Sequence, residues 1–387
     1  MKKAIKVCHV TSVHTRNDTR IFHKECASLA RAGYDVTLLV ADGKSDEAIS
    51  GVKIKSVGTV FKSRAKRMLC SRKPMLKKAQ ETDAEIYHLH DPELLPLGVK
   101  LKSLGKKVIF DSHENYPAQI KVKHYLPAIV RNVASAVYRS YETYALGKID
   151  AVIAPCTFYN GVNIFDGRCK VNEIISNAPL LSEFYDRYEM AEKPRSQPPM
   201  VCHVGGLEYS RGITHLIKAA YKANVTLALA GRFCPAEYKI EVEKMPEYAC
   251  VNYLGYLSRA EVLDLYKRSS IGAATILNIG QYNTGDNFAT KVYEYMSMGL
   301  PVLVSRYPYA EKVLERYKFG MSVDPENIDE IADAIRYITD NPEIAKQMGE
   351  NGRRAVLEEF NWGIEEKKLL GLYERIIDDI KEYKSNK

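Results

Sequence analysis

The sequence predicts an α/β fold made of two doubly wound, Rossmann-like domains that face each other across a cleft. Short apolar runs alternate with amphipathic helical stretches in both halves of the chain, which is typical of parallel sheets covered by helices. The 387 residues also exceed the usual size of a single hydrophobic core. A polar, proline-rich stretch, EKPRSQPPM at 192–200, marks a linker between the halves.

These observations set the expected domain boundaries. We expect an N-terminal domain over residues 1–180, a linker over 181–200 and a C-terminal domain over 201–365. A last helix over 366–387 is expected to cross back to the first domain.

Composition argues against several protein classes. A content of 46% apolar and 27% charged residues is ordinary for a globular protein. No apolar run approaches the roughly 18 residues of a membrane-spanning helix, and the start MKKAIKVCHV is expected to be a strand rather than a signal segment. The eight cysteines are scattered without a C-x-x-C pair, which favours a reducing, cytoplasmic location over a disulfide framework or a thiolate zinc site.

The net charge of +8 is concentrated in the first half. Residues 1–180 carry 29 Lys and Arg against 17 Asp and Glu, whereas residues 181–387 carry 27 against 31. The run at 62–78 contains eight basic residues and no acid. Aromatic residues do not interleave with it as a nucleic-acid stacking platform requires, so the preferred partner is an anionic membrane surface at the inner face of the cell membrane. A merely solvated surface is the alternative.

The first half opens as a β-α-β unit without G-x-G-x-x-G, so a nicotinamide cofactor is not indicated. Asp18 or Thr19 is expected to cap its first helix. Two later strands, 85–90 and 107–113, end in histidines flanked by acids. A structural role and a site role are both open for these two residues.

The second half contains a strand-loop-helix-strand unit over 271–304. Its helix is expected from about Asn287 to Met298, with Asp286 at the cap and Glu294 eight residues on, roughly 12 Å along the axis. Two acids around a phosphate-binding helix start suit a nucleotide diphosphate sugar, with Lys291 neutralising phosphate charge. A capping acid and a solvated surface acid are the alternative.

Two other loops that follow strands are expected at the same edge of the C-terminal sheet. GGLEYSRGI brings Gly206 and Arg211, and AGRF brings Arg232. Glycines let backbone approach a ligand, and guanidinium groups fork onto phosphate oxygens. Turn glycines and surface arginines are the alternative for each loop alone.

In combination, these motifs resemble family 4 glycosyltransferases of the GT-B fold, especially bacterial surface-polysaccharide members. The spacing Asp286-x7-Glu294 resembles that family's Glu-x7-Glu motif. Further stretches that resemble its motifs are KVYEYMSMGLP, GGLEYSRG, DSHE and HVTSVHTRNDTRIFHKE. The resemblance covers residues 5–365.

The resemblance implies retaining transfer of a sugar from a nucleotide diphosphate sugar, UDP-sugar by default, with no cofactor and no required metal. No D-x-D motif occurs in the chain, in keeping with the metal-free class. Glu294 would bind the donor ribose. His113 and Asp286 would be the catalytic residues beside the donor sugar. The acceptor would be a lipid-linked glycan or a polysaccharide.

Other roles follow from the same resemblance. Arg211 and Lys291 would hold the diphosphate. The further donor-binding residues would be Gly206, Arg232, Asn287, Phe288, Ala289 and Thr290. The acceptor-side residues would be Asn17, Asp18 and Arg20.

Three features depart from the family pattern. Asp286 replaces the usual glutamate, Gly206 stands where many members carry a basic residue, and the opening loop lacks a Gly-Gly pair. Arg211, with Arg232, would therefore carry more of the phosphate contact.

Two other functions fit the same sequence. A nucleotide-sugar 2-epimerase shares the fold and would convert the donor without an acceptor. A non-catalytic nucleotide- or nucleic-acid-binding protein would use the basic run instead.

Overall fold

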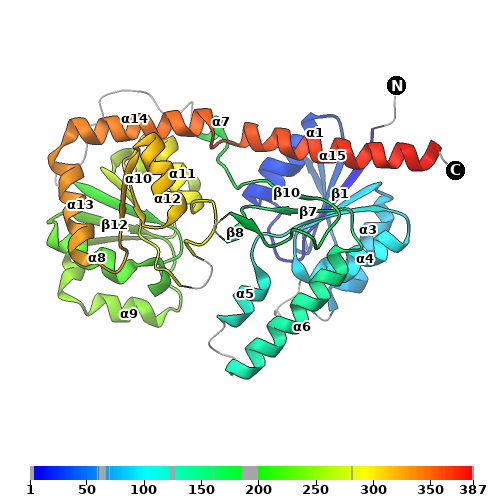
Figure 1. The fold of residues 1–387 in the computed structure, drawn as a ribbon, viewed down its shortest axis with the longest axis horizontal. Coiled ribbons are helices and arrows are strands. Elements are labelled where there is room, and N and C mark those ends of the chain that lie inside the picture. Colours follow the sequence, from blue (N-terminus) through cyan, green and yellow to red (C-terminus); the bar gives the residue numbers. More distant parts are fainter. Residues whose placement is uncertain are drawn as a thin grey trace. The chain divides into compact units, whose positions relative to one another are not determined.

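The computed structural model describes residues 4–58, 60, 67–68, 70–122, 127–159, 161–184, 199–279 and 282–385. The chain forms two compact α/β units (Figure 1). Unit 1 consists of Met1–Thr157, Val162–Asn177 and Gly363–Lys387, and unit 2 of Phe158–Gly161 and Ala178–Trp362. The prediction of an α/β chain with two parallel-sheet domains is confirmed.

The sheet of unit 1 has the strand order β10-β7-β6-β5-β1-β2-β4-β3. Its strands are β1 (Lys6–Val10), β2 (Asp35–Val40), β3 (Glu47–Ile49), β4 (Val52–Ser56), β5 (Ile86–Leu89), β6 (Lys107–Asp111), β7 (Ala151–Ala154) and β10 (Asn172–Ile174). All neighbours are parallel except β3 and β4. The central strands are buried along their length, which explains their continuous apolar runs.

Helices cover this sheet. They are η1 (Thr19–Cys26), α1 (Ala27–Arg31), α3 (Arg72–Thr82), η2 (Pro92–Leu94), α4 (Leu95–Ser103), α5 (Tyr116–Lys121), α6 (Ala128–Leu146) and α15 (Trp362–Ser385). Helix α5 ends at Lys121, and Pro127 is the N-cap of the separate helix α6. Proline lacks an amide donor and suits a helix start.

The first helix starts where the sequence predicts. The Asp18 carboxylate accepts hydrogen bonds from the amides of Arg20 and Ile21, and so caps η1. The eight residues of η1 form a π-helix, however, a wider coil that often occurs at functional sites. Residues four and five positions apart then share a face, which turns Arg20, Lys24 and Glu25 into the interior.

Unit 2 has a parallel sheet in the order β13-β12-β11-β14-β15-β16. Its strands are β11 (Met200–Val204), β12 (Thr226–Ala230), β13 (Val251–Gly255), β14 (Ile271–Ala274), β15 (Val302–Ser305) and β16 (Gly320–Val323). The short strand β8 (Phe158–Tyr159) belongs to unit 2, and its pairing partner β9 (Val162–Asn163) belongs to unit 1.

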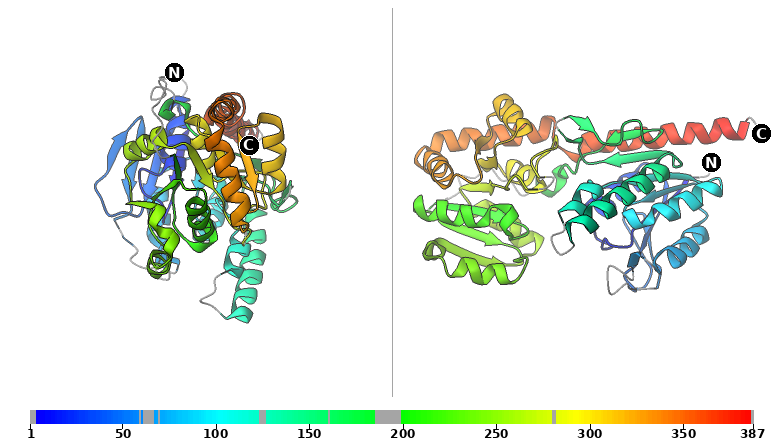
Figure 2. Two further views of the ribbon diagram at one scale, coloured as in Figure 1. Left: turned by 90° about the vertical axis from the view of Figure 1, so that its left-hand side faces the viewer. Right: turned by 60° about the horizontal axis from the view of Figure 1, so that its bottom comes forward.

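The helices of unit 2 pack on both faces of its sheet (Figures 1 and 2). They are α7 (Leu181–Phe184), η4 (Tyr209–Arg211), α8 (Ile213–Lys222), α9 (Glu237–Glu243), η5 (Pro246–Cys250), α10 (Arg259–Arg268), α11 (Thr290–Ser297), α12 (Pro308–Tyr317), α13 (Ile328–Asp340) and α14 (Pro342–Glu358). Among the helices that the structure describes, none combines the length and apolar content that a membrane crossing requires.

In both sheets the chain reverses its direction of winding beside the first strand. In unit 1, β1 lies between β2 and β5, and in unit 2, β11 lies between β12 and β14. The loops after these neighbouring strands diverge at the carboxyl ends of the strands. Open α/β sheets bind ligands at such points.

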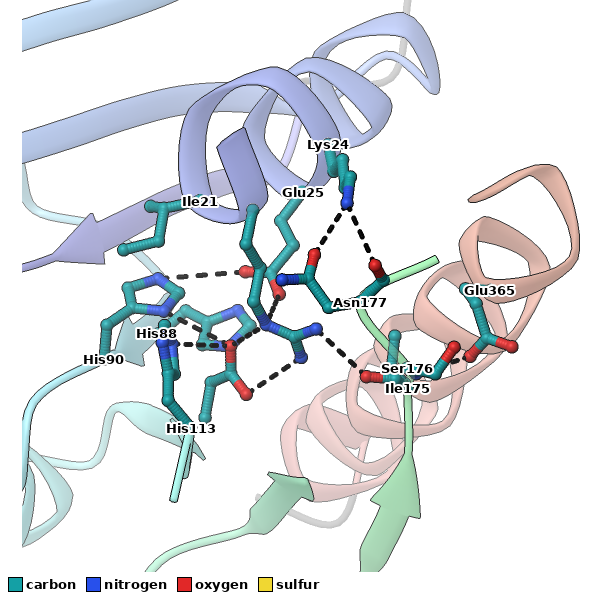
Figure 3. Close-up of polar contacts among 12 residues, drawn as sticks. Ile21, Lys24, Glu25, His88, His90, His113, Ile175, Ser176, Asn177 and Glu365 are labelled. Atoms are coloured by element: carbon teal, nitrogen blue, oxygen red, sulfur yellow. Dashed lines mark hydrogen bonds and ion pairs between the residues drawn. The ribbon is translucent and has the colours of Figure 1, made fainter. Parts of the chain in front are cut away.

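Helix α15 is anchored in unit 1 by polar contacts. The Tyr373 hydroxyl is buried and lies 2.9 Å from His88 Nδ1 and 3.4 Å from His9 Nε2. The Glu365 carboxylate accepts a hydrogen bond of 2.7 Å from the Ser176 amide (Figure 3). The last helix thus belongs to the core of unit 1 although it follows unit 2 in the sequence.

Candidate functional site

The loops after β11, β12 and β14, with the start of α11, form what we call the unit 2 edge. Two of its glycines have left-handed backbone conformations, with φ of 128° at Gly205 and 148° at Gly231. A Cβ on Gly231 would lie 1.8 Å from the Gly205 carbonyl oxygen, and one on Gly205 would lie 3.1 Å from Lys291 Nζ. Only glycine lets these backbones approach one another and the lysine so closely.

Lys291 lies in the first turn of α11, and its Nζ is 2.8 Å from His203 Nε2. His203 Nδ1 in turn lies 3.1 Å from the carbonyl oxygen of Ala273, which suits a proton on Nδ1 and leaves Nε2 to accept from the lysine. Burial and the charge of Lys291 hold the pKa of His203 well below its usual range. Burial, and then the charge of Arg211, lower the pKa of Lys291 to about 7.

Arg211 is held in place at the end of η4. Its Nε lies 3.0 Å from Glu208 Oε1, and its Nη2 donates to the Tyr282 hydroxyl at 3.0 Å. The guanidinium carbon lies 4.4 Å from the centre of the Tyr282 ring. Two basic side chains thus stand at one edge, and the charge of Arg211 adds to the effect of burial in lowering the pKa of Lys291.

Glu294 is not a solvated surface acid. Its carboxylate accepts a hydrogen bond of 2.7 Å from the Tyr266 hydroxyl and lies 3.0 Å from Arg259 Nη1. Only 17% of its side chain is exposed. Burial and the nearby carboxylate raise the pKa of Tyr266 well above its usual range, so this hydroxyl stays protonated and donates.

The loop before α11 differs from the prediction. The helix begins at Thr290 with Ala289 as its N-cap, so Asp286 does not cap it and instead lies exposed in the preceding loop. The Phe288 side chain is buried among aromatic rings, and its amide donates to the Tyr293 hydroxyl at 3.3 Å. The side chain and the amide of Phe288 thus both have partners within the chain, and a donor contact through Phe288 stays a prediction.

The remaining donor-side residues lie on the surface of this edge. Gly206 and Arg232 are exposed, and the loops that carry them are joined by a hydrogen bond from the Leu207 amide to the Arg232 carbonyl at 3.0 Å. The Arg232 guanidinium lies 5.0 Å from the centre of the Tyr256 ring, which is 75% exposed. Asn287 is partly buried, and its carbonyl accepts from the Tyr307 hydroxyl at 2.7 Å.

In unit 1, a second group of polar residues surrounds His113. His113 Nε2 lies 3.1 Å from Asp111 Oδ2, and its ring is 4.9 Å from that of His14. His14 Nδ1 lies 3.1 Å from Asp18 Oδ2. Burial opposes a charge on His14, but Asp18 and Asp91 outweigh it and raise the pKa. His14 was not among the predicted site residues, although it lies in the loop after the first strand.

The predicted acceptor-side residues have separate environments. Asn17 is exposed. Asp18 is engaged by His14 and by two helix amides, which overcome burial and lower its pKa. The guanidinium of Arg20 is buried and makes two hydrogen bonds to Asp111, of 2.8 and 3.0 Å, and its acceptor-side role stays a prediction.

Arg20 belongs to a buried cluster beneath the unit 1 loops. Its Nε also lies 3.1 Å from Glu25 Oε1. Burial would raise the pKa of Asp111, but Arg20 and His113 outweigh it and hold the pKa well below its usual range. Burial and the charge of Asp111 raise the pKa of Glu25 well above its usual range, despite Arg20.

Histidines complete this buried cluster. His9 Nδ1 lies 2.9 Å from His90 Nε2, and all three rings of His9, His88 and His90 are fully buried. Among the described residues, His9, Glu25, His88 and His90 have possible metal-ligating atoms within 4.8 Å of one another, as do His90, Asp111 and His113. Arg20 already supplies a positive charge to the acids of both groups, so the cluster reaches charge balance through the chain itself.

Comparison with known proteins supports the predicted resemblance. The family model described as "Glycosyl transferases group 1" matches residues 186–355, and that described as "Glycosyltransferase Family 4" matches residues 19–159. The chain is 25% identical over 178 residues to a glycogen synthase of Mycobacterium tuberculosis, a match that covers 44% of this chain and 41% of that protein. The chain thus spans about two fifths of the length of that curated relative.

Solved structures share the fold over nearly the whole chain. A sucrose-phosphate synthase from Thermosynechococcus elongatus matches with a TM-score of 0.75 and 18% identity, covering 97% of this chain and all of that one. Anabaena HepE, solved in complex with UDP and glucose, matches with a TM-score of 0.66 and 14% identity, covering 98% of this chain and 100% of that one. The predicted GT-B fold is confirmed, and the names of these relatives agree with the predicted enzyme class.

The assignment of Arg20 to the buried cluster makes a testable prediction. Arg20→Met should lower the free energy of unfolding by about 3–5 kcal/mol at neutral pH, because it leaves the Asp111 carboxylate buried without its guanidinium partner. Arg31→Met, on an arginine whose side chain is 57% exposed, should cost less than about 1 kcal/mol. Urea denaturation measures both.

The pH dependence separates this role from a loss of packing. In the wild type, the depressed pKa of Asp111 gives stability that is present above its unfolded pKa and lost as the pH falls. In Arg20→Met, protonation of Asp111 removes the unpaired charge, so the deficit should shrink as the pH approaches about 4. A deficit that is equal at both pH values would contradict the assignment.

Proposed function

We propose that the chain is a glycosyltransferase that transfers a sugar from a nucleotide diphosphate sugar, with retention at the anomeric carbon. The observation that carries the proposal is the unit 2 edge: Lys291 lies beside the backbone of Gly205 and within the electrostatic influence of Arg211, and Glu294 lies three residues after Lys291 on α11. The HepE structure was solved with UDP and glucose, which supports UDP-sugar as the donor.

The two cations fit the hard step of such a transfer. As the bond between the anomeric carbon and the diphosphate oxygen breaks, negative charge grows on the leaving diphosphate. Lys291, Arg211 and the amides at the start of α11 are fixed groups that would stabilise this charge. The acceptor hydroxyl forms the new bond on the same face of the sugar, and its proton passes to a leaving phosphate oxygen. These residues would supply the positive charge without a required metal.

Other residues take roles around the sugar in this proposal. Glu294, oriented by Tyr266 and Arg259, would accept hydrogen bonds from the donor ribose. Asp286 is exposed and free to reach the hydroxyls of the donor sugar from its loop. His113, oriented by Asp111, would lie by the reacting carbon, and Asn17 would face the acceptor.

The acceptor is proposed to be a lipid-linked glycan or a polysaccharide of the bacterial cell surface. The basic first half of the chain supports work at the inner face of the cell membrane, where anionic lipids attract Lys and Arg.

A thermal-shift screen over UDP-, GDP- and ADP-sugars tests the donor class. We expect a rise in melting temperature with UDP-sugars, since a ligand that binds the folded state stabilises it. The best donor is then incubated with and without candidate acceptors. Conversion of the donor sugar to its 2-epimer without an acceptor would favour the epimerase alternative. No shift with any nucleotide sugar would contradict the proposal.

Glu294→Gln should weaken donor binding. The substitution removes charge-assisted hydrogen bonds worth about 1.5–3 kcal/mol, so the Kd should rise about tenfold to a hundredfold. The exposed Glu243→Gln is the matched control and should leave the Kd unchanged. Calorimetry measures both, and an unchanged Kd for Glu294→Gln would remove this residue from the site.

Donor affinity should also depend on pH through Lys291. Since the pKa of this lysine lies at about 7 in the free protein, the ammonium form that binds diphosphate is lost as the pH rises above that value. The Kd should be flat below about pH 7 and should rise by up to tenfold per unit above it. Calorimetry at pH 8 in buffers of different ionisation enthalpy should show proton uptake. Lys291→Arg should remove both effects, and a flat profile in the wild type would contradict the role of Lys291.

A further inference from the structure

Helix α6 exposes its apolar residues and buries its polar ones. Ile129, Val133 and Val137 follow one another at intervals of four, so they share one face, and they are 79%, 58% and 64% exposed. Ser135 and Glu142 lie among the buried residues of the same helix. A surface helix of a globular protein normally has the opposite arrangement, with its apolar stripe toward the core.

Buried polar contacts fix this orientation. The Ser135 hydroxyl donates to the Pro117 carbonyl at 2.8 Å, and the Glu142 carboxylate accepts from Arg168 Nη2 at 2.6 Å. Turning the apolar row inward would break both contacts and leave Arg168 without its carboxylate. The exposure of the row is therefore imposed by the packing of unit 1.

The exposed charged residues that the structure describes on α5 and α6 are basic. Arg139 on α6, Lys148 just after it and Lys121 at the end of α5 are exposed. The acid within α6, Glu142, is buried and paired with Arg168. In Figure 2 (left), the amino-terminal end of α6 extends beyond the sheet of unit 1.

We propose that the α6 face, formed by Ile129, Val133 and Val137 with the neighbouring cations, inserts into the headgroup region of an anionic lipid bilayer. An exposed apolar row on a helix whose exposed charged residues are basic is the pattern of a helix that lies in a membrane interface. A second copy of the chain fits less well, because pairing of two α6 faces would bring like cations together with no exposed acid on either helix.

This surface differs from the one that the sequence analysis favoured. The basic run at 62–78 lies partly outside the described residues, and Arg67 is paired with Glu93 at 2.6 Å. The proposal deepens the proposed function by naming the surface at which a lipid-linked acceptor would be reached, and it rests on that function only for this purpose.

Vesicle flotation of the full chain tests the proposal. The wild type should bind vesicles of phosphatidylglycerol and phosphatidylcholine at equal parts, and should bind pure phosphatidylcholine at least fivefold less. The variant Ile129→Ser, Val133→Ser, Val137→Ser should lose most of the binding to the mixed vesicles. The matched control replaces three exposed apolar residues of unit 2, Ile240, Tyr337 and Leu357, by serine and should bind as the wild type does.

Two further measurements keep the outcomes separate. Donor affinity of the α6 variant should be unchanged, because its substitutions are in unit 1 and the donor-binding residues are in unit 2. If the wild type does not bind the donor, this result would contradict the proposed function but not the α6 proposal. Equal vesicle binding by the wild type and the α6 variant would overturn the α6 proposal. A second outcome would also overturn it: the wild type does not bind vesicles and is dimeric by sedimentation velocity, whereas the α6 variant is monomeric.

Discussion

Two cations held close together at one sheet edge are the constraint on which this account depends. Lys291 and Arg211 stand on different loops of unit 2, and the partner of Lys291 is the neutral His203 rather than a carboxylate. The fold therefore holds the ammonium group of Lys291 partly out of water without a carboxylate partner. Burial of this charge costs free energy, and an anionic ligand would offset that cost. At the same point, Gly205 and Gly231 let their two loops approach each other closely.

Unit 1 also holds a cation at the point where its winding reverses, but there acids of the chain balance the charge. There the cation is Arg20, and it is buried against Asp111 and Glu25. Charge is balanced within the chain, and the histidines beneath it join this cluster to Tyr373 on α15. Arg20 therefore stabilises the domain and orients Asp111, which leaves His113 as the ring of this cluster that is partly exposed. In unit 2 the buried lysine thus has a neutral histidine as its partner, whereas in unit 1 the buried arginine pairs with an acid that also contacts His113.

Much of this could be predicted from the sequence, because it depends on local patterns. Apolar runs that alternate with helices indicated two parallel sheets, and the positions of Arg211 and Lys291 after strands indicated one edge. The start of α11 was predicted too early, because Asp286 is a good capping residue in isolation. Asp286 lies in the loop instead because Phe288 is buried in an aromatic cluster, and no local sequence pattern predicts that burial.

The burial of Arg20 in unit 1 could not be predicted from a local pattern either. The family resemblance implied an acceptor-side role for Arg20, and its partner Asp111 lies 91 residues away in the sequence. The π-helical coil that turns it inward has no periodic signature in so short a stretch. The exposure of the apolar row of α6 could not be predicted for a different reason. A helical period shows which residues share a face, but it does not show which face packs against the protein.

The most direct test is a crystal structure of the full chain with a bound UDP-sugar. The account predicts diphosphate oxygens within hydrogen-bond distance of Lys291 Nζ and the Arg211 guanidinium, and a ribose hydroxyl donating to Glu294. A nucleotide bound elsewhere on the chain, or bound at this edge without contact to Lys291 and Arg211, would contradict it.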